Sequence, residues 1–239
     1  MPVNADRLTI TAIPSSDGKL YSEFPDGDRQ PDFRLSEIDF TGLDGEDLPE
    51  GITSLAGEFA ISGDKIVATG TNPRDAVPSE GYAWLVGADS GTTNGVISCD
   101  FHGIGSESGL MIRSVDSFNF IDLIFIMLGE EPRLLLVAVE NNEPTITIAG
   151  YSPPNYTDGD VLDVQLVMID DRIVCYVDGV LGFDVSDVTV HSTGTFHGLK
   201  FGGTNTAVGF NNLKLPHAYA PQINDLYAMC AAHSMFHHN

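Results

Sequence analysis

The chain has 239 residues, of which 34 are acidic and 11 basic, so its formal net charge is −23. This length suits one large β domain or two small domains, and a hydrophobic content of 42 % excludes a disordered acidic tail. The charge excludes nucleic acid as a partner, because phosphate groups would be repelled, and it disfavours anionic membrane surfaces.

A proline-rich segment opens the chain. Residues 1–36 carry prolines at positions 2, 14, 25 and 31 and show little periodicity, which predicts an extended N-terminal arm with one strand at Leu8–Ile13. The first residues lack the basic start and apolar stretch of a secretory signal, so no signal peptide is visible. We expect a folded β domain over residues 37–215.

Short runs rich in Val, Ile, Phe and Thr, bounded by Gly, Asp, Asn and Pro, recur between residues 57 and 215. They predict strands at Glu58–Ser62, Lys65–Thr69, Tyr82–Val86, Gly95–His102, Leu110–Arg113, Asn119–Met127, Leu134–Val139, Thr145–Ala149, Val161–Ile169, Arg172–Asp178, Val180–Phe183, Thr195–Phe201 and Val208–Leu215. With no helix between them, these strands predict an all-β fold, a two-sheet antiparallel jelly-roll sandwich. The missing crossover helices exclude a parallel α/β fold.

Local patterns give some of these strands more detail. Val161–Ile169 alternates between polar and apolar residues, which is typical of a strand with one buried face. Asp178-Gly179 between apolar runs predicts a type I′ hairpin, and Gly129–Arg133 is predicted to be a turn. The most apolar stretch, Phe118–Met127, is interrupted by Asp122 and is shorter than the roughly 18 residues of a membrane span, so we expect no membrane insertion.

Residues 216–239 form a linker followed by a short predicted helix. Pro216 and Pro221 precede Asn224, a suitable cap for the helical run Asp225–Phe236. The apolar face of this helix would hold Ile223, Leu226, Tyr227, Cys230 and Met235. A terminal apolar helix of this kind docks on its own domain or on a partner chain.

Three cysteines, Cys99, Cys175 and Cys230, lie far apart in the sequence. An odd and sparse set argues against a disulfide framework and against a zinc site. Cys175 lies within an apolar run, so we interpret it as a small buried hydrophobic residue.

Several segments together resemble the concanavalin A-like lectin/laminin-G-like jelly-roll superfamily, of the kind found in phage virion proteins. They are the hairpin Gly57–Thr69, the pair Gly109–Arg113 and Asp116–Ile121, the turn Tyr176–Gly179, and the closing segments Phe201–Gly203 and Val208–Leu215. The resemblance covers roughly residues 39–215. It implies a two-sheet sandwich whose members bind sugars or proteins, sometimes with Ca²⁺, and occasionally hydrolyse glycans.

Catalytic patterns are incomplete in this chain. Relatives that cleave glycans carry Glu-x-Asp-x-x-Glu on one strand, whereas here Glu37 and Asp39 are followed by Gly42, so the proton donor is missing. The segment Gly105–Gly109 places Glu107 where a serine nucleophile would stand, and we interpret it as a loop. His233 and His237 share one helical face, but no third metal ligand is evident, and a solvated terminus explains them.

Calcium and sugar remain the ligands to consider. Ca²⁺ would suit the oxygen-rich loops Asp26–Asp28, Asp44–Asp47 and Asp158–Asp160, although Asp-Gly turns explain all three without metal, and we expect no other cofactor. Sugar binding uses an aromatic platform with planar polar groups. The candidate ligand-binding residues are Trp84, His102, Arg113, Asp116 and Asn119, with a role in the core or in a hairpin loop as the alternative.

These observations predict a non-catalytic structural or adhesive module of a virion, as phage capsid decoration or tail or fibre component, or of a similar extracellular assembly. We expect the termini to contact other assembly proteins, the chain to form a homo-oligomer, and the sandwich to bind host surface glycans. The alternative is a glycoside hydrolase on a jelly-roll scaffold, with its carboxylates paired in space.

Overall fold

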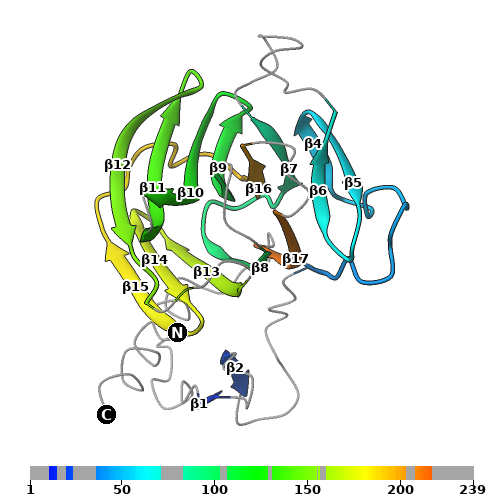
Figure 1. Ribbon diagram of the computed structural model, residues 1–239. Coiled ribbons are helices and arrows are strands. Elements are labelled where there is room, and N and C mark those ends of the chain that lie inside the picture. The colour runs from blue at the N-terminus through cyan, green and yellow to red at the C-terminus, as the bar shows by residue number, and fades with distance from the viewer. Residues whose placement is uncertain are drawn as a thin grey trace, which may run out of the picture.

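The computed structural model describes residues 11–14, 20–23, 36–70, 83–102, 107–128, 131–154, 156, 160–202 and 208–216. The regular secondary structure of these residues is entirely β, in the strands β1 to β17. Two antiparallel sheets pack face to face, and Figure 1 shows β9 to β12 in one layer and β13 to β15 in the other. The predicted all-β, two-sheet antiparallel fold is therefore confirmed.

Sheet I has the strand order β12-β11-β10-β9-β16-β7-β4. Its strands are β4 (Thr53–Ala56), β7 (Trp84–Asp89), β9 (Ser108–Asp116), β10 (Asn119–Leu128), β11 (Glu131–Glu140), β12 (Glu143–Tyr151) and β16 (Phe196–Phe201). Neighbours in this order are antiparallel, and β9, β10, β11 and β12 follow one another as a meander.

Sheet II has the strand order β15-β14-β13-β8-β17-β6-β5, with β3 also paired to β17. Its strands are β3 (Ser36–Ile38), β5 (Glu58–Ile61), β6 (Ile66–Thr69), β8 (Gly95–His102), β13 (Val161–Ile169), β14 (Arg172–Val177), β15 (Val180–Val185) and β17 (Gly209–Leu215). A separate antiparallel pair consists of β1 (Thr11–Pro14) and β2 (Leu20–Glu23).

The main hydrophobic core lies between the two sheets. In β13 the side chains of Leu162, Val164, Leu166 and Met168 all enter this core, as the period-two pattern predicts. Their partners from sheet I include Leu110, Ile112, Leu123 and Leu199, which alternate in the same way along their strands. Burial of both inward faces holds the layers together, since apolar area removed from water contributes about 25 cal/mol per Å².

The sheets also meet at their edges. At one edge Gly57, with φ of +83°, is the single residue between β4 of sheet I and β5 of sheet II. At the other edge β12 packs against β15, and a Cβ placed on Gly182 would lie 3.1 Å from the ring of Tyr151. The core is therefore closed on both sides, which leaves the ends of the sandwich as the places where connections gather.

The Asp178-Gly179 hairpin and two strand boundaries agree with the sequence-based predictions. Asp178 and Gly179 have φ of +50° and +75°, as a type I′ turn requires, and Val177 pairs with Val180 across it. The boundaries Gly95–His102 and Val161–Ile169 are confirmed without change.

The predicted turn Gly129–Arg133 is wrong over its second half. Strand β11 begins at Glu131, and Pro132 lies within it, paired with Met127. Proline is tolerated here because β12 ends opposite Leu134, so among the described residues no strand pairs with Pro132 on the side away from β10.

Several predictions concern residues outside the described part of the chain. The C-terminal helix Asp225–Phe236 lies there, as do most of the arm 1–36 and the loop Asp26–Asp28. The strand expected at Leu8–Ile13 overlaps β1, which begins at Thr11 and ends at Pro14. In the described residues, no helix is long and apolar enough to cross a membrane.

Candidate functional site

Two hairpin turns of sheet I meet at one end of the sandwich. In the β9–β10 turn the carboxylate of Asp116 accepts the backbone N–H of Phe118 at 2.7 Å. The side-chain nitrogen of Asn119 donates to the same carboxylate, at 2.9 Å from one Asp116 oxygen and 3.0 Å from the other. Asp116 and Asn119 therefore shape this turn, which is the role in a hairpin loop that the sequence offered as the alternative to ligand binding.

The β11–β12 turn, Asn141-Asn142, is hydrogen-bonded to the first turn. The N–H of Asn141 donates to the side-chain oxygen of Asn119 at 3.1 Å, and the N–H of Asn142 donates to the carbonyl of Phe118 at 3.0 Å. Both asparagines have positive φ, 53° and 66°, a conformation that Asn tolerates better than most residues.

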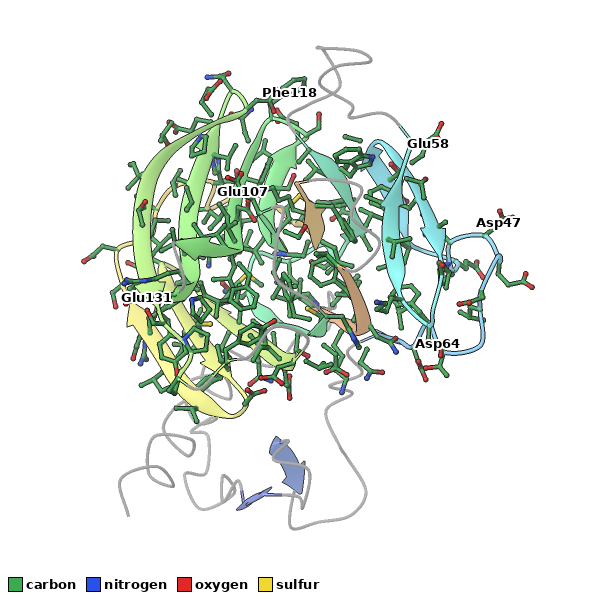
Figure 2. The ribbon with its side chains drawn as sticks, viewed as in Figure 1. Asp47, Glu58, Asp64, Glu107, Phe118 and Glu131 are labelled. Atoms are coloured by element: carbon green, nitrogen blue, oxygen red, sulfur yellow. The ribbon has the colours of Figure 1, made fainter. Side chains whose placement is uncertain are left out.

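We call the area formed by these turns the turn surface, and it consists of Val115, Asp116, Phe118, Asn119, Asn141 and Asn142. Figure 2 shows Phe118 at the end of the molecule where the β9–β10 hairpin closes. Val115 is 56 % exposed, and the buried side-chain oxygen of Asn142 has no hydrogen-bond partner among the described residues. A carboxylate, three amides and an aromatic ring therefore lie together at this end of the sandwich, where Asp116 and Asn141 are exposed and Phe118, Asn119 and Asn142 are half-buried.

Arg113 lies beneath this surface and is fully buried. Its Nε donates to the carbonyl of Thr93 at 3.1 Å, one terminal nitrogen donates to the carbonyl of Val188 at 3.4 Å, and the other donates to the carbonyl of Asp170. Burial lowers the pKa of Arg113, and the negative charges of Asp170 and Asp171 oppose that shift. The guanidinium thus joins connections from both sheets.

His197 of β16 completes this buried network. Its Nδ1 accepts the backbone N–H of Arg113 at 3.2 Å, and its Nε2 lies 2.9 Å from the carbonyl of Thr92. Since Nδ1 accepts and Nε2 faces an acceptor, the neutral ring carries its proton on Nε2. Burial lowers the pKa of His197 to about 4.

The five predicted ligand residues do not form one surface. Arg113, Asp116 and Asn119 lie at the end of the turn surface, but Arg113 is buried below it. His102 is the last residue of β8 in sheet II, next to the connection into the opposite end of β9. Burial lowers the pKa of the His102 ring, and the charge of Lys65 lowers it further.

Trp84 begins β7 and points into the core with 2 % of its surface exposed. Its indole N–H donates to the carbonyl of Thr69 in β6 at 2.7 Å, so the side chain bridges the two sheets. Contact of all five residues with a ligand stays a prediction. The geometry gives Trp84 and Arg113 supporting positions, and it leaves Asp116 exposed and Asn119 half-buried.

A buried ion pair lies on the outward face of sheet I. The Nζ of Lys200 is 3.0 Å from Oδ2 of Asp122, both side chains are 1 % exposed, and Nζ also donates to the carbonyl of Glu107 at 2.6 Å. Lys200 pairs with Gly109 in the intervening strand β9, where the absence of a side chain lets it reach across to β10.

The Asp122 carboxylate is incompletely satisfied, because its Oδ1 has no hydrogen-bond partner among the described residues. Burial raises its pKa, while the ammonium of Lys200 opposes the shift. The same outward face carries a buried apolar cluster of Ala56, Ala83, Leu85, Met111, Phe120 and Val139. The middle strands of this face therefore carry buried side chains.

Two of the residues considered for catalysis and for metal, Asp39 and Asp44, have structural partners. Asp39 accepts the N–H of Thr41 at 2.8 Å, and hydrogen bonds from Thr41 lower its pKa, which is opposite to what a proton donor needs. The carboxylate of Asp44 accepts the N–H groups of Gly63 and Asp64, both at 3.0 Å. In the described part of the chain, no group of three or more His, Cys, Asp or Glu side chains is arranged to hold a metal ion.

Several residues of the turn surface and of the buried ion pair were not predicted from the sequence. The Asn141-Asn142 pair between two apolar runs was a turn signal of the same kind as Asp178-Gly179. Asp122 and Lys200 were visible as charges inside otherwise apolar strands, which in a sandwich indicates a buried pair. Nothing in the sequence marked Phe118 as part of a surface, because its exposure depends on where the second hairpin ends.

Three solved structures resemble this chain. A carbohydrate-binding module, CBM66 from Bacillus subtilis, matches with a TM-score of 0.51 at 16 % identity, over 68 % of this chain and 93 % of that chain. The galectin LEC-6 of Caenorhabditis elegans matches with a TM-score of 0.41 at 11 % identity, over 55 % and 88 %. The CBM2 module of the evolved Dit of Lactobacillus casei BL23 phage J-1 matches with a TM-score of 0.41 at 10 % identity, over 74 % and 93 %.

No protein-family model matches the chain, and no curated protein matches it in sequence. At 16 % identity the likeness to CBM66 concerns the fold. It agrees with the concanavalin A-like sandwich that the sequence motifs predict.

Protonation of His197 should destabilise the fold. An unfolded histidine titrates near 6.5 and the folded ring near 4, so the stabilisation is complete above pH 6.5 and is lost as the pH falls toward 4. The expected loss attributable to this ring is about 3 kcal/mol. Urea unfolding at pH 7 and pH 4.5 measures it, and His197→Gln should flatten the difference between the two pH values. Equal pH dependence of the two proteins would contradict the assignment.

Removing one partner of the Asp122–Lys200 pair should lower the free energy of unfolding more than replacing both partners by apolar residues. Asp122→Leu leaves a buried ammonium without its counter-ion, with an expected loss of about 3–5 kcal/mol in the free energy of unfolding. The double variant Asp122→Leu/Lys200→Met removes both charges and should lie within about 1 kcal/mol of the parent. Urea titrations of the single and double variants measure the coupling, and additive losses would show that the pair does not interact.

Proposed function

We propose that this chain is a non-catalytic glycan-binding module that forms part of a virion, as capsid decoration or a tail or fibre component, or of a similar extracellular assembly. The turn surface is the observation that carries the binding role. Its aromatic ring, amides and carboxylate are the groups with which proteins hold sugar rings and hydroxyls. The fold likeness to a carbohydrate-binding module supports the same role.

Binding is favoured over cleavage by the accessibility of the groups involved. Asp122, whose raised pKa would suit a general acid, is 1 % exposed and engaged with Lys200. Asp116 supplies a single carboxylate to the turn surface, and it also accepts hydrogen bonds from Phe118 and Asn119. A glycoside hydrolase needs two carboxylates on either side of an accessible bond. Glycan cleavage by carboxylates paired in space stays the alternative.

The net charge of −23 disfavours anionic glycans as ligands. Sulfated or uronate-rich glycans would be repelled by this surface, at distances up to the roughly 8 Å Debye length of physiological salt. Neutral glycans with vicinal hydroxyls suit the side-chain amides of Asn141 and Asn142, since an amide both donates and accepts hydrogen bonds.

The assembly role rests on the sequence and on cysteine chemistry. Cys99 and Cys175 are buried free thiols, and burial raises the pKa of both. An extracellular sandwich without a disulfide in its described part suits a protein that folds in a reducing cytoplasm and leaves by host lysis. The arm 1–36 would attach the subunit to its neighbours in a homo-oligomer.

Glycan binding is tested on an array of neutral bacterial and algal glycans with the parent protein and Phe118→Ala. We expect the variant to lose at least about fivefold in affinity, since an aromatic platform contributes about 1 kcal/mol or more. Val180→Ala, a change at a residue that is 47 % exposed on sheet II, is the matched control and should bind as the parent does. Release of reducing ends from any bound glycan would favour the enzymatic alternative.

Assembly is tested by deleting residues 1–35, which keeps β3 and its pairing with β17. The deletion should abolish incorporation into particles while the thermal unfolding of the sandwich stays cooperative. Mass photometry and negative-stain microscopy of the particle fraction measure incorporation. A deleted chain that is still incorporated would refute the anchoring role of the arm.

A further inference from the structure

The outward face of sheet II carries a second buried apolar cluster. Val96, Val167 and Val174 form a row across β8, β13 and β14, because Val167 pairs with Val96 on one side and with Val174 on the other. Ile169 and Tyr176 flank this row, and all five side chains are at most 5 % exposed. We call these five residues the outer patch.

The burial of the outer patch is not explained by the described residues. The patch lies on the opposite side of sheet II from the main core, where an antiparallel sheet usually meets water. The cluster contains only its own five members, and no other hydrophobic side chain of the described chain packs against it. A cover for the outer patch is therefore to be sought outside the described ranges.

The C-terminal segment starts beside this patch. Strand β17 runs antiparallel to β8, so the end of β17 lies at the start of β8. A Cβ placed on Gly95 would lie 2.9 Å from the ring of Pro216, and the next residue of β8 is Val96. From Pro216 the chain continues for 23 residues, to Asn239.

Two segments of the chain join sheet II at this end of β17, and their compositions differ. The arm also arrives here, since Ser36 pairs with Leu215. Ten of the first 35 residues are charged, whereas the segment 217–239 contains one Asp and no Glu, Lys or Arg. An apolar patch is covered at least cost by the segment with the fewest charges to desolvate.

We propose that residues 217–239 pack on the outer patch of their own chain, with the run Asp225–Phe236 as a helix that turns Leu226, Tyr227 and Cys230 toward the sheet. Twelve helical residues extend about 18 Å, and three strands are about 10 Å wide, so one helix covers the row of valines. The C-terminus then belongs to the sandwich, and the arm alone is left to reach neighbouring subunits.

A disulfide trap tests this contact in the full-length chain. Cys230 is present naturally, and Val174→Cys or Val96→Cys places a partner in the outer patch. Mild oxidation should give an intrachain disulfide with Cys230 in at least one variant, identified by non-reducing electrophoresis and peptide mass spectrometry. Ile146→Cys, at a residue that is 58 % exposed on β12 of sheet I, is the matched control and should stay reduced.

Hydrogen exchange supplies the second measurement. A chain ending at Pro216 should exchange amides of β13 and β14 at least about tenfold faster than the full chain and should bind a hydrophobic dye. The deletion of residues 1–35 should change neither property. Faster exchange after the arm deletion alone would identify the arm as the cover, and an interchain disulfide would identify a second copy. Either result overturns the proposal, as does a truncated chain that exchanges like the parent.

Discussion

The guanidinium of Arg113 holds the two sheets together at the end of the sandwich that carries the turn surface. It donates to carbonyls in three connections, β7–β8, β13–β14 and β15–β16, which strand pairing does not join. A buried cation that loses such partners costs several kcal/mol, so all three connections are held in place together. The His197 ring accepts the N–H of the same residue and ties β16 to this arrangement.

The middle strands of both outward sheet faces carry buried side chains, whereas the turn surface at one end of the sandwich is partly exposed. Sheet I carries the Asp122–Lys200 pair beside a buried apolar cluster, and sheet II carries the outer patch. The turn surface stands on the rigid support that Arg113 supplies, and its exposed groups need little reordering to meet a ligand. Preorganisation of this kind lowers the entropic cost of binding.

Most strands were predictable because their signals are local. The alternation in Val161–Ile169 and the Asp178-Gly179 turn depend on neighbours in sequence, and both predictions are confirmed. Pro132 misled the prediction of a turn, because its place in a strand depends on where β12 ends, many residues later. Likewise β4, which carries few β-branched or aromatic residues, is held by pairing with β7 and was not predicted.

The fold class follows from the sequence alone, since the period of hydrophobic residues and the turn residues act over a few positions. The same holds for the acidic character of the chain, with its net charge of −23. Only the tertiary structure decided which polar residues meet. Trp84 and Arg113 became supports inside the molecule, whereas Asp116 and Asn119 were joined by Asn141 from another hairpin. The physical reason is that sheet order brings distant residues together, and no local pattern encodes that order.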